Sequence, residues 1–288
     1  GCSGLTRITI PNSVTSIGYQ AFACCSGLTS VTIGDGVTSF GNEMFYKCSS
    51  LKSIVVEKGN TKYDSRDNCN AIIETESNTL IVGCKKSVIP NSVTNIRSRA
   101  FYDCSGLTKI TIPNSVTSIG LEAFCRCGNL KSVKISSSIT KIEQGVFSRT
   151  GLTSVIIPEG VTSLSLWAFD NSPELATIEL PSTLTSIGDF VFENCPELTN
   201  ITIPDCVTSI GISAFANCKN LTDVYCLATN VPSTNSDAFK GSYPEHMTLH
   251  VPAEAINSYK KTAPWSRFGN IVEIANTDII NIPAKAVL

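Results

Sequence analysis

A 23-residue pattern recurs along most of this 288-residue chain, and it constrains the fold more than any other feature. One copy spans residues 107–129 and reads LTKITIPNSVTSIGLEAFCRCGN. The spacing of 23 residues has two exceptions, a copy of 33 residues from Leu51 and a copy of 22 from Leu130. The copies begin at Leu5, Leu28, Leu51, Cys84, Leu107, Leu130, Leu152, Leu175 and Leu198.

Within each copy, apolar residues recur at positions that suit strands and turns. Ile110 and Ile112 alternate with polar residues, as in a half-buried strand, and Pro113 ends that strand because it cannot donate to a ladder. A second apolar pair follows at Val116 and Ile119. Next comes a glycine, such as Gly120, which we interpret as a turn. An Ala-Phe pair then returns to the interior in nearly every copy.

One copy cannot bury these side chains alone, whereas stacked copies bury them against identical neighbours. The sequence therefore predicts a β-rich, right-handed solenoid of about nine coils with parallel strands, spanning residues 1–220. A tenth start at Leu221 leads into residues 221–288, which we interpret as a degenerate last repeat and a C-terminal cap. We expect a short helix over residues 252–261 there, with Trp265, Phe268, Ile271 and Val272 as apolar cover.

The long coil carries an insertion near residues 57–83. Two apolar runs, residues 71–73 and 80–82, flank a polar segment at residues 76–78, which is a hairpin signal. We expect this hairpin to protrude as a tolerated insertion, with a binding role as the alternative.

The repeat LTxITIPxSVTSIGxxAFxxC resembles the BspA-like leucine-rich repeat family, which is related to the repeats of treponemal surface proteins. The resemblance covers residues 1–220 directly and implies a leucine-rich repeat solenoid. It also implies a bacterial cell-surface or secreted protein, with adhesion and host-protein binding in some members. The family carries its function on no fixed residues, so no site transfers by position.

Thirteen cysteines raise the question of disulfides or metal. Thr150 and Ser172 replace the recurring cysteine in two copies, which favours a column of free, inward-facing thiols over bridges. The close pair Cys125 and Cys127 is a weak zinc signal. The recurring position is held by Cys2, Cys25, Cys48, Cys104, Cys127, Cys195 and Cys218.

Other functional signals are scarce. His246 and His250 are the only histidines, and their spacing suits metal binding on a helix, but residues 247–251 read as a strand, where the two would face apart. We find no nucleophile elbow or phosphate loop, so we predict no enzyme, no cofactor and no metal site. A net charge of −2 gives no electrostatic case for nucleic acid, and no apolar run is long enough to span a bilayer.

The outward strand positions give the better lead. Lys86 and Lys109 hold the same position in successive copies, which predicts a spacing of about 5 Å, and Lys134 follows one copy later. Val88 and Ile156 add exposed apolar contact. Charge is sorted as well: residues 1–151 hold 16 basic and 10 acidic side chains, against 6 and 14 in residues 152–288.

We therefore expect an extracellular or cell-surface protein that binds another protein, such as a host matrix or plasma protein, through this strand face. One alternative is a structural spacer that displays another domain. Another is a carbohydrate-binding accessory module, although Tyr225 is the only aromatic residue in the two outward columns. Because the chain begins in mid-repeat, we expect it to be a fragment or a processed form.

Overall fold

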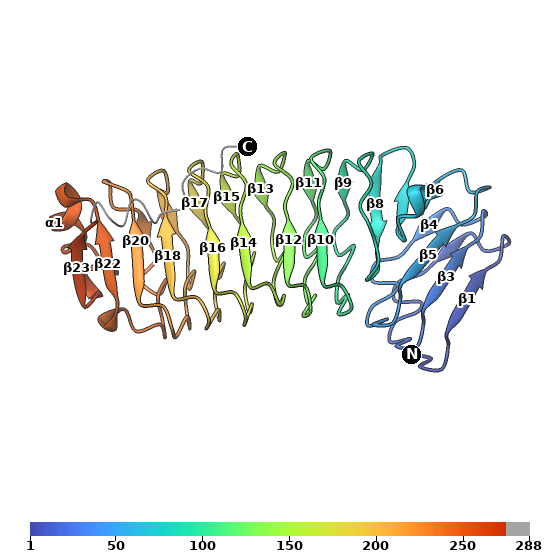
Figure 1. The fold of residues 1–288 in the computed structure, drawn as a ribbon, viewed down its shortest axis with the longest axis horizontal. Coiled ribbons are helices and arrows are strands. Elements are labelled where there is room, and N and C mark those ends of the chain that lie inside the picture. The colour runs from blue at the N-terminus through green and yellow to red at the C-terminus, as the bar shows by residue number, and fades with distance from the viewer. Residues whose placement is uncertain (275–288) are drawn as a thin grey trace. The chain divides into compact units, whose positions relative to one another are not determined.

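The computed structural model describes residues 1–274, which divide into two compact units. Unit 1 comprises Gly1–Ile139 and Glu143–Leu152, and unit 2 comprises Thr140–Ile142 and Thr153–Leu288. Within each unit, successive coils place their strands side by side in parallel, as Figure 1 shows. The predicted parallel-strand solenoid is thus confirmed.

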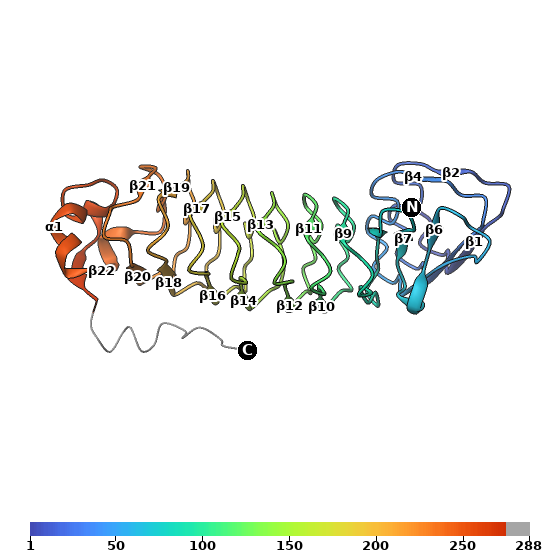
Figure 2. The same cartoon turned by 90° about the horizontal axis from the view of Figure 1, so that it is seen from above.

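Most coils contribute a longer strand and a two-residue strand, and the two kinds form separate ladders. In unit 2 the short strands line one side of the coils and the longer strands line the other, as seen from above in Figure 2. The longer strands of unit 1 are β1 (Arg7–Ile10), β3 (Ser30–Ile33), β5 (Ser53–Val56), β10 (Lys109–Thr111) and β12 (Ser132–Lys134). The short strands of unit 1 are β2 (Ser16–Ile17), β4 (Ser39–Phe40), β9 (Asn95–Ile96) and β11 (Ser118–Ile119).

Unit 2 repeats this arrangement and extends it further than the sequence pattern suggests. Strand β20 pairs with β18, then β22 with β20 and β23 with β22, so the ladder crosses residue 221 without a break. The longer strands are β14 (Ser154–Ile156), β16 (Thr177–Glu179), β18 (Asn200–Ile203), β20 (Asp223–Cys226), β22 (Thr248–Val251) and β23 (Asn270–Glu273). The short strands are β13 (Lys141–Ile142), β15 (Ser163–Leu164), β17 (Ser186–Ile187), β19 (Ser209–Ile210) and β21 (Ser233–Thr234).

Residues 1–274 therefore form about twelve turns, and the predicted nine is too low. The late turns escape the pattern because their connections differ in length and composition. Their inward residues nevertheless keep register, since Val224 lies beside Leu249 and Leu249 beside Ile271. The boundary predicted at residues 220 and 221 stays a prediction.

Stacked phenylalanines run through the interior of each unit. Ring centroids lie 5.0 Å apart between Phe101 and Phe124 in unit 1, and 5.4 Å apart between Phe192 and Phe215 in unit 2. These four rings are at most 1% exposed. Each such ring stabilises its unit by roughly 1.5–3 kcal/mol through burial, and the parallel stacking holds successive coils in register.

The segment around most of the stacked phenylalanines turns the chain with two left-handed residues, which follow the expected glycine. In the coil from Leu107, the left-handed residues are Glu122 and Arg126, with φ of 54° and 64°. Gly120 has no positive φ; instead, a Cβ there would lie 2.3 Å from the backbone nitrogen of Ser98 in the preceding coil. The glycine is thus needed for close approach of coils, and it also begins the turn as predicted, since its carbonyl accepts the Ala123 N–H.

The insertion forms the expected hairpin, but the expected protrusion is wrong. Strands β7 (Ile72–Glu74) and β8 (Thr79–Val82) pair antiparallel, and β8 pairs in parallel with β9, so the hairpin joins the short-strand ladder. Ile73 and Leu80 are fully buried. The reason is the missing Ala-Phe pair in this coil: the hairpin supplies the apolar side chains instead. A third strand, β6 (Tyr63–Asp64), pairs with β7, and a 3₁₀ helix, η1 (Arg66–Asn68), follows it.

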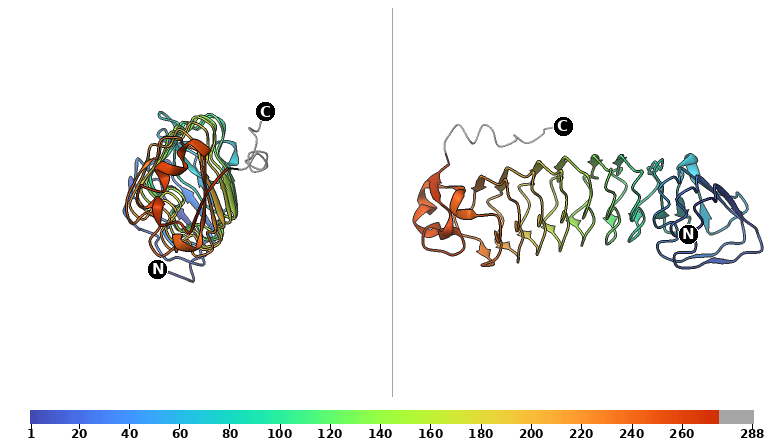
Figure 3. Two further views of the ribbon diagram at one scale, coloured as in Figure 1. Left: turned by 90° about the vertical axis from the view of Figure 1, so that its left-hand side faces the viewer. Right: turned by 90° about the horizontal axis from the view of Figure 1, so that it is seen from below.

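The cap of unit 2 contains the expected short helix, α1 (Ile256–Tyr259), preceded by the 3₁₀ helix η3 (Ala253–Ala255). Figure 3 shows this segment over the last coils. Two more 3₁₀ helices, η2 (Pro244–His246) and η4 (Trp265–Arg267), complete the cap. Trp265 is fully buried against Phe239, whereas Val272 is 38% exposed and does not provide the predicted cover. The predictions for residues 275–288 lie outside the described residues.

Candidate functional site

The outward face of the longer strands is the surface on which the sequence places its candidate residues. In unit 1, β10 and β12 lie in register, so that Lys109 is beside Ser132 and Thr111 is beside Lys134. Strand alternation turns Ile110 inward, where it is 5% exposed, and leaves both lysines exposed. The structure therefore brings Lys109 and Lys134 onto one face, one coil apart and displaced by two residues.

Lys86 and Val88 are also exposed, but their coil is irregular. It forms no longer strand, and among the described residues β10 has only β12 as a ladder partner. The insertion of the preceding coil contacts this segment instead. The Val88 N–H donates to the Cys69 carbonyl, and the Asn70 side-chain amide donates to the Lys86 carbonyl. The predicted 5 Å spacing between Lys86 and Lys109 has no strand pairing to support it. Val88 is 67% exposed, so an apolar contact does stand beside Lys86.

Ile156 belongs to unit 2, where it lies on β14 and is 61% exposed. Its partner in the ladder is Glu179 of β16. Within unit 2, Ile156 thus stands beside an acidic residue.

Electrostatics distinguish the lysines of unit 1 from other cations nearby. In the part of the chain that the structure describes, no carboxylate forms an ion pair with Lys86, Lys109 or Lys134. Arg99, by contrast, pairs with both Glu43 and Glu122. The strand-face lysines therefore keep their charge available to a ligand in solution.

The sequence analysis did not predict a cluster of three side chains at the end of the strand face. His250 of β22 stacks on Tyr225 of β20 with ring centroids 4.2 Å apart, and its Nε2 lies 2.9 Å from an Asp223 carboxylate oxygen. The sequence signal for this cluster was the strand expected over residues 247–251, which the structure confirms as β22. His246 lies in the 3₁₀ helix η2, apart from that strand.

The hydrogen bonds of the cysteine column show why serine or threonine can replace cysteine there. The Cys127 Sγ donates to the Phe101 carbonyl at 3.1 Å, and the Cys218 Sγ donates to the Phe192 carbonyl at 3.1 Å, in each case to the preceding coil. The Ser242 hydroxyl makes the same contact with Phe215 at 2.6 Å. The position thus suits a small buried donor: cysteine and serine donate to the preceding coil, and Thr150 donates to the Phe147 carbonyl of its own coil.

Burial makes these thiols chemically inert. It raises the pKa of Cys48 to about 11 and of Cys104 and Cys218 to about 12, so little thiolate exists near neutral pH. The inward orientation is confirmed for five of the seven cysteines, whereas Cys104 is half-buried and Cys2 is exposed. No disulfide joins any of the thirteen cysteines, all of which lie in the described range.

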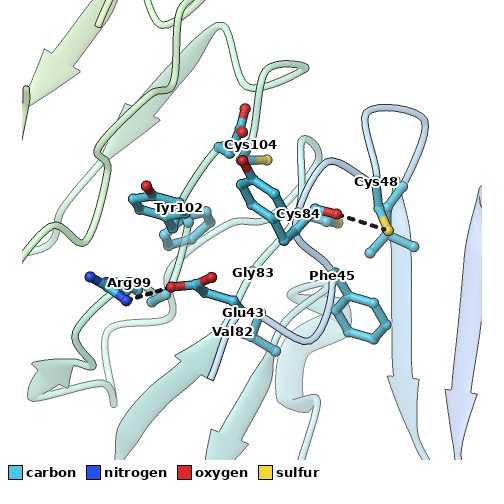
Figure 4. Close-up of a pocket in the computed structure, with 14 residues that line it drawn as sticks. Glu43, Phe45, Cys48, Val82, Gly83, Cys84, Arg99, Tyr102 and Cys104 are labelled. Atoms are coloured by element: carbon cyan, nitrogen blue, oxygen red, sulfur yellow. Dashed lines mark hydrogen bonds and ion pairs between the residues drawn. The ribbon is translucent and has the colours of Figure 1, made fainter. Parts of the chain in front are cut away.

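A small cavity lies in unit 1 where the hairpin interrupts the phenylalanine stack. Its volume is about 30 Å³, enough for one water molecule. Figure 4 shows Glu43, Arg99 and Tyr102 on one side of it, and Cys48 and Cys84 on another. A cavity of this size cannot hold a substrate or cofactor, and within residues 1–274 no group of side chains is arranged to hold a metal ion.

Within the same described range, no helix has the length and apolar character to cross a bilayer. The coils present columns of exposed side chains on their surface. Two kinds of column are available, the outward strand positions and the left-handed residues of the turns.

Comparisons with known proteins agree with this architecture. The model of the BspA type leucine rich repeat region matches the chain in six copies, over residues 1–81, 81–173 and 140–260. A search of curated proteins gives no match.

Solved structures of leucine-rich repeat proteins have the same fold. One from Bacteroides ovatus is 25% identical with a TM-score of 0.68, over 93% of this chain and 69% of its own. One from Eubacterium ventriosum is 24% identical with a TM-score of 0.58, over 73% and 64%. The pneumococcal vaccine antigen PcpA is 19% identical with a TM-score of 0.57, over 94% and 68%.

Proposed function

This chain belongs to the BspA-type leucine-rich repeat family, and on that premise we propose that it is a non-enzymatic extracellular or cell-surface protein that binds another protein through its strand face. Repeat proteins of this kind commonly act as interaction modules. A solenoid suits such a role because it presents an extended, rigid surface whose outward residues can vary without disturbing the core.

The observation that carries the proposal is the pair Lys109 and Lys134. Both are exposed on adjacent strands of one rigid ladder, and neither has a carboxylate partner among the described residues. Like charges on neighbouring strands of one face repel each other, although less than charges directly opposite, so stability alone would not favour them. An acidic ligand would relieve that repulsion.

Lys86 and Val88 add a further exposed cation and an exposed apolar side chain in unit 1. A valine that is 67% exposed has no stabilising role in the free protein, whereas a mixed basic and apolar surface suits a protein partner. The partner that fits best is an acidic segment of a host matrix or plasma protein. Ile156 is proposed as a further contact, within unit 2.

The test is binding of the purified chain to a panel of extracellular-matrix and plasma proteins at low and at physiological salt. The variant Lys86→Glu/Lys109→Glu/Lys134→Glu should bind at least about tenfold more weakly, because truncated or reversed anchor residues typically contribute most of the binding energy. The difference should shrink as salt rises, because the Debye length falls.

A matched control carries the same change of net charge on another surface. Lys47, Arg126 and Arg149 are exposed at left-handed turn positions of unit 1, so Lys47→Glu/Arg126→Glu/Arg149→Glu should bind as the wild type does. Circular dichroism must show both variants folded. If both variants bind equally weakly, the change of net charge and not the strand-face position causes the loss. If the wild type binds no member of the panel, the alternative of a structural spacer is favoured.

A further inference from the structure

The turns of unit 2 form a second outward surface, which we call the ridge. Each coil places two left-handed residues four positions apart, on either side of the buried phenylalanine. Their backbone N–H groups donate to carbonyls of the next coil, for example Trp167 to Asp189 and Asn171 to Glu193. Equivalent residues of successive coils are therefore held in register, as they are on the strand face.

The first of these two positions carries aromatic side chains in unit 2. Trp167 and Phe190 occupy it in adjacent coils, with φ of 58° and 57° and ring centroids 6.1 Å apart. Trp167 is 39% exposed, and Ile212 on the next coil is 43% exposed. The column elsewhere holds polar or small residues: Gln20, Glu43, Arg99, Glu122, Gly145 and Ser213.

Burial explains this aromatic pair only in part. Phe190 is half-buried, but the Trp167 side chain is 39% exposed and forfeits part of the burial energy that an aromatic ring could contribute. The left-handed backbone itself belongs to the turn, since it recurs at this position in the other coils, so the distinctive feature is the pair of aromatic side chains. The pair is therefore a candidate platform for a ligand with a flat apolar face.

The second left-handed position supplies amides. Asn171, Asn194 and Asn217 hold it in three successive coils, each partly exposed. The Asp189 carboxylate lies on the same ridge, where its Oδ1 accepts the Ile212 N–H at 2.7 Å. Amides offer both donors and acceptors, so the platform is bordered by groups that match hydroxyls.

We propose that the ridge of unit 2 binds a neutral, β-linked oligosaccharide, with Trp167 stacked against the flat face of one sugar ring and Phe190, tilted by 38° to Trp167, in contact with the next. The C–H bonds of such faces match the negative π-faces of the aromatic rings. The coil spacing is about 4.8 Å, comparable with the length of one pyranose residue in a β-linked chain.

Charge decides between ligand classes. Residues 152–288 carry 14 acidic and 6 basic side chains, so sulfated or uronic glycans and acidic peptides would be repelled. A neutral, hydroxyl-rich chain has no such penalty and can use the amides. The ridge is a different surface from the strand face, so a negative result for one binding site leaves the proposal for the other unaffected.

Tryptophan fluorescence tests the proposal directly. The chain has two tryptophans, and Trp265 is fully buried, so a change in emission on ligand addition reports Trp167. Cellohexaose, chitohexaose and a β-1,3-glucan hexaose are added separately to the full chain, up to millimolar concentration. We expect at least one of them to shift the emission to shorter wavelength with saturable dependence. No shift with any of the three overturns the proposal.

Variants then locate the site. Trp167→Gln and Phe190→Ser insert residues that the same column already tolerates at Gln20 and Ser213, so folding should be retained. Each should lower the affinity about tenfold or more in calorimetry, as expected for an aromatic anchor. Tyr19→Ala, an exposed aromatic of unit 1 beside the same column, should have no effect. Undiminished binding by Trp167→Gln, or equal loss in Tyr19→Ala, overturns the assignment.

Discussion

Units 1 and 2 share their inward columns and differ in their outward ones. The phenylalanine stack has nearly the same spacing in both, 5.0 Å between Phe101 and Phe124 and 5.4 Å between Phe192 and Phe215. At the second left-handed turn position, unit 1 carries cations in three coils and Cys24 and Asp103 in two others, whereas unit 2 carries amides in three successive coils and Gly241 in the next. The cations are Lys47, Arg126 and Arg149, and the amides are Asn171, Asn194 and Asn217.

The comparison shows where selection for function can act in a repeat protein of this kind. Inward positions are fixed by packing against identical neighbours, so they are nearly interchangeable between the units. Outward positions contribute little to stability and can therefore differ in charge and aromaticity. Recognition is expected there, on a basic strand face in unit 1 and on an aromatic and amide ridge in unit 2.

The largest expected difference separates inward from outward thiols. Cys2, Cys24 and Cys206 are exposed and should be alkylated rapidly in the native protein, whereas Cys127 and Cys218 are fully buried. The buried thiols react only after opening of their unit, which should slow them by about 1,000-fold or more. Intact-mass spectrometry with peptide mapping measures both classes.

Denaturation without reductant completes that experiment. All thirteen cysteines should then accept the label, because a column that admits Thr150 and Ser172 requires a donor and not a bridge. Fast native labelling of Cys127 but not Cys218 would show that the two interiors are not equivalent. Missing labels in pairs after denaturation would reveal disulfides.

A truncation in the hairpin should be the next largest effect. Leu80→Ala removes a fully buried side chain and should lower the free energy of unfolding by about 2–5 kcal/mol. Glu76→Ala in the exposed turn of the same hairpin should change it by less than about 0.5 kcal/mol. Denaturant unfolding of both variants provides the measurement. Equally small effects would mean that the hairpin is a tolerated protrusion after all.

The smallest effect tests the left-handed turn positions. Arg149→Gly in unit 1 should stabilise by about 0.5–1 kcal/mol, since glycine adopts the observed φ of 58° without steric penalty. Asn194→Gly in unit 2, at φ 57°, should change stability by a few tenths of a kcal/mol at most, because asparagine already tolerates this conformation. Thermal unfolding of the two variants compares them, and destabilisation by Arg149→Gly would show that its side chain holds the turn.

The core of each coil could be predicted from the sequence because it depends on local periodicity. Ile110, Val116, Ile119 and Phe124 recur at fixed spacing, and only stacking against copies of themselves can bury them. The exposure of Lys109 and Lys134 followed from strand alternation alone. The late turns were missed because their connections change length while their inward residues keep register.

Tertiary structure decided what depends on contacts between different coils. The hairpin became core because a neighbouring coil offered β9 as a partner, and the same insertion left Lys86 without a strand beside Lys109. The role of Gly120 and the donor role of Cys127 each involve the preceding coil. The contact between Trp167 and Phe190 depends on the left-handed turns, and the residue types in that column do not predict such turns. Periodicity thus determined the repeat, whereas the close approach of successive coils determined which of its surfaces can bind.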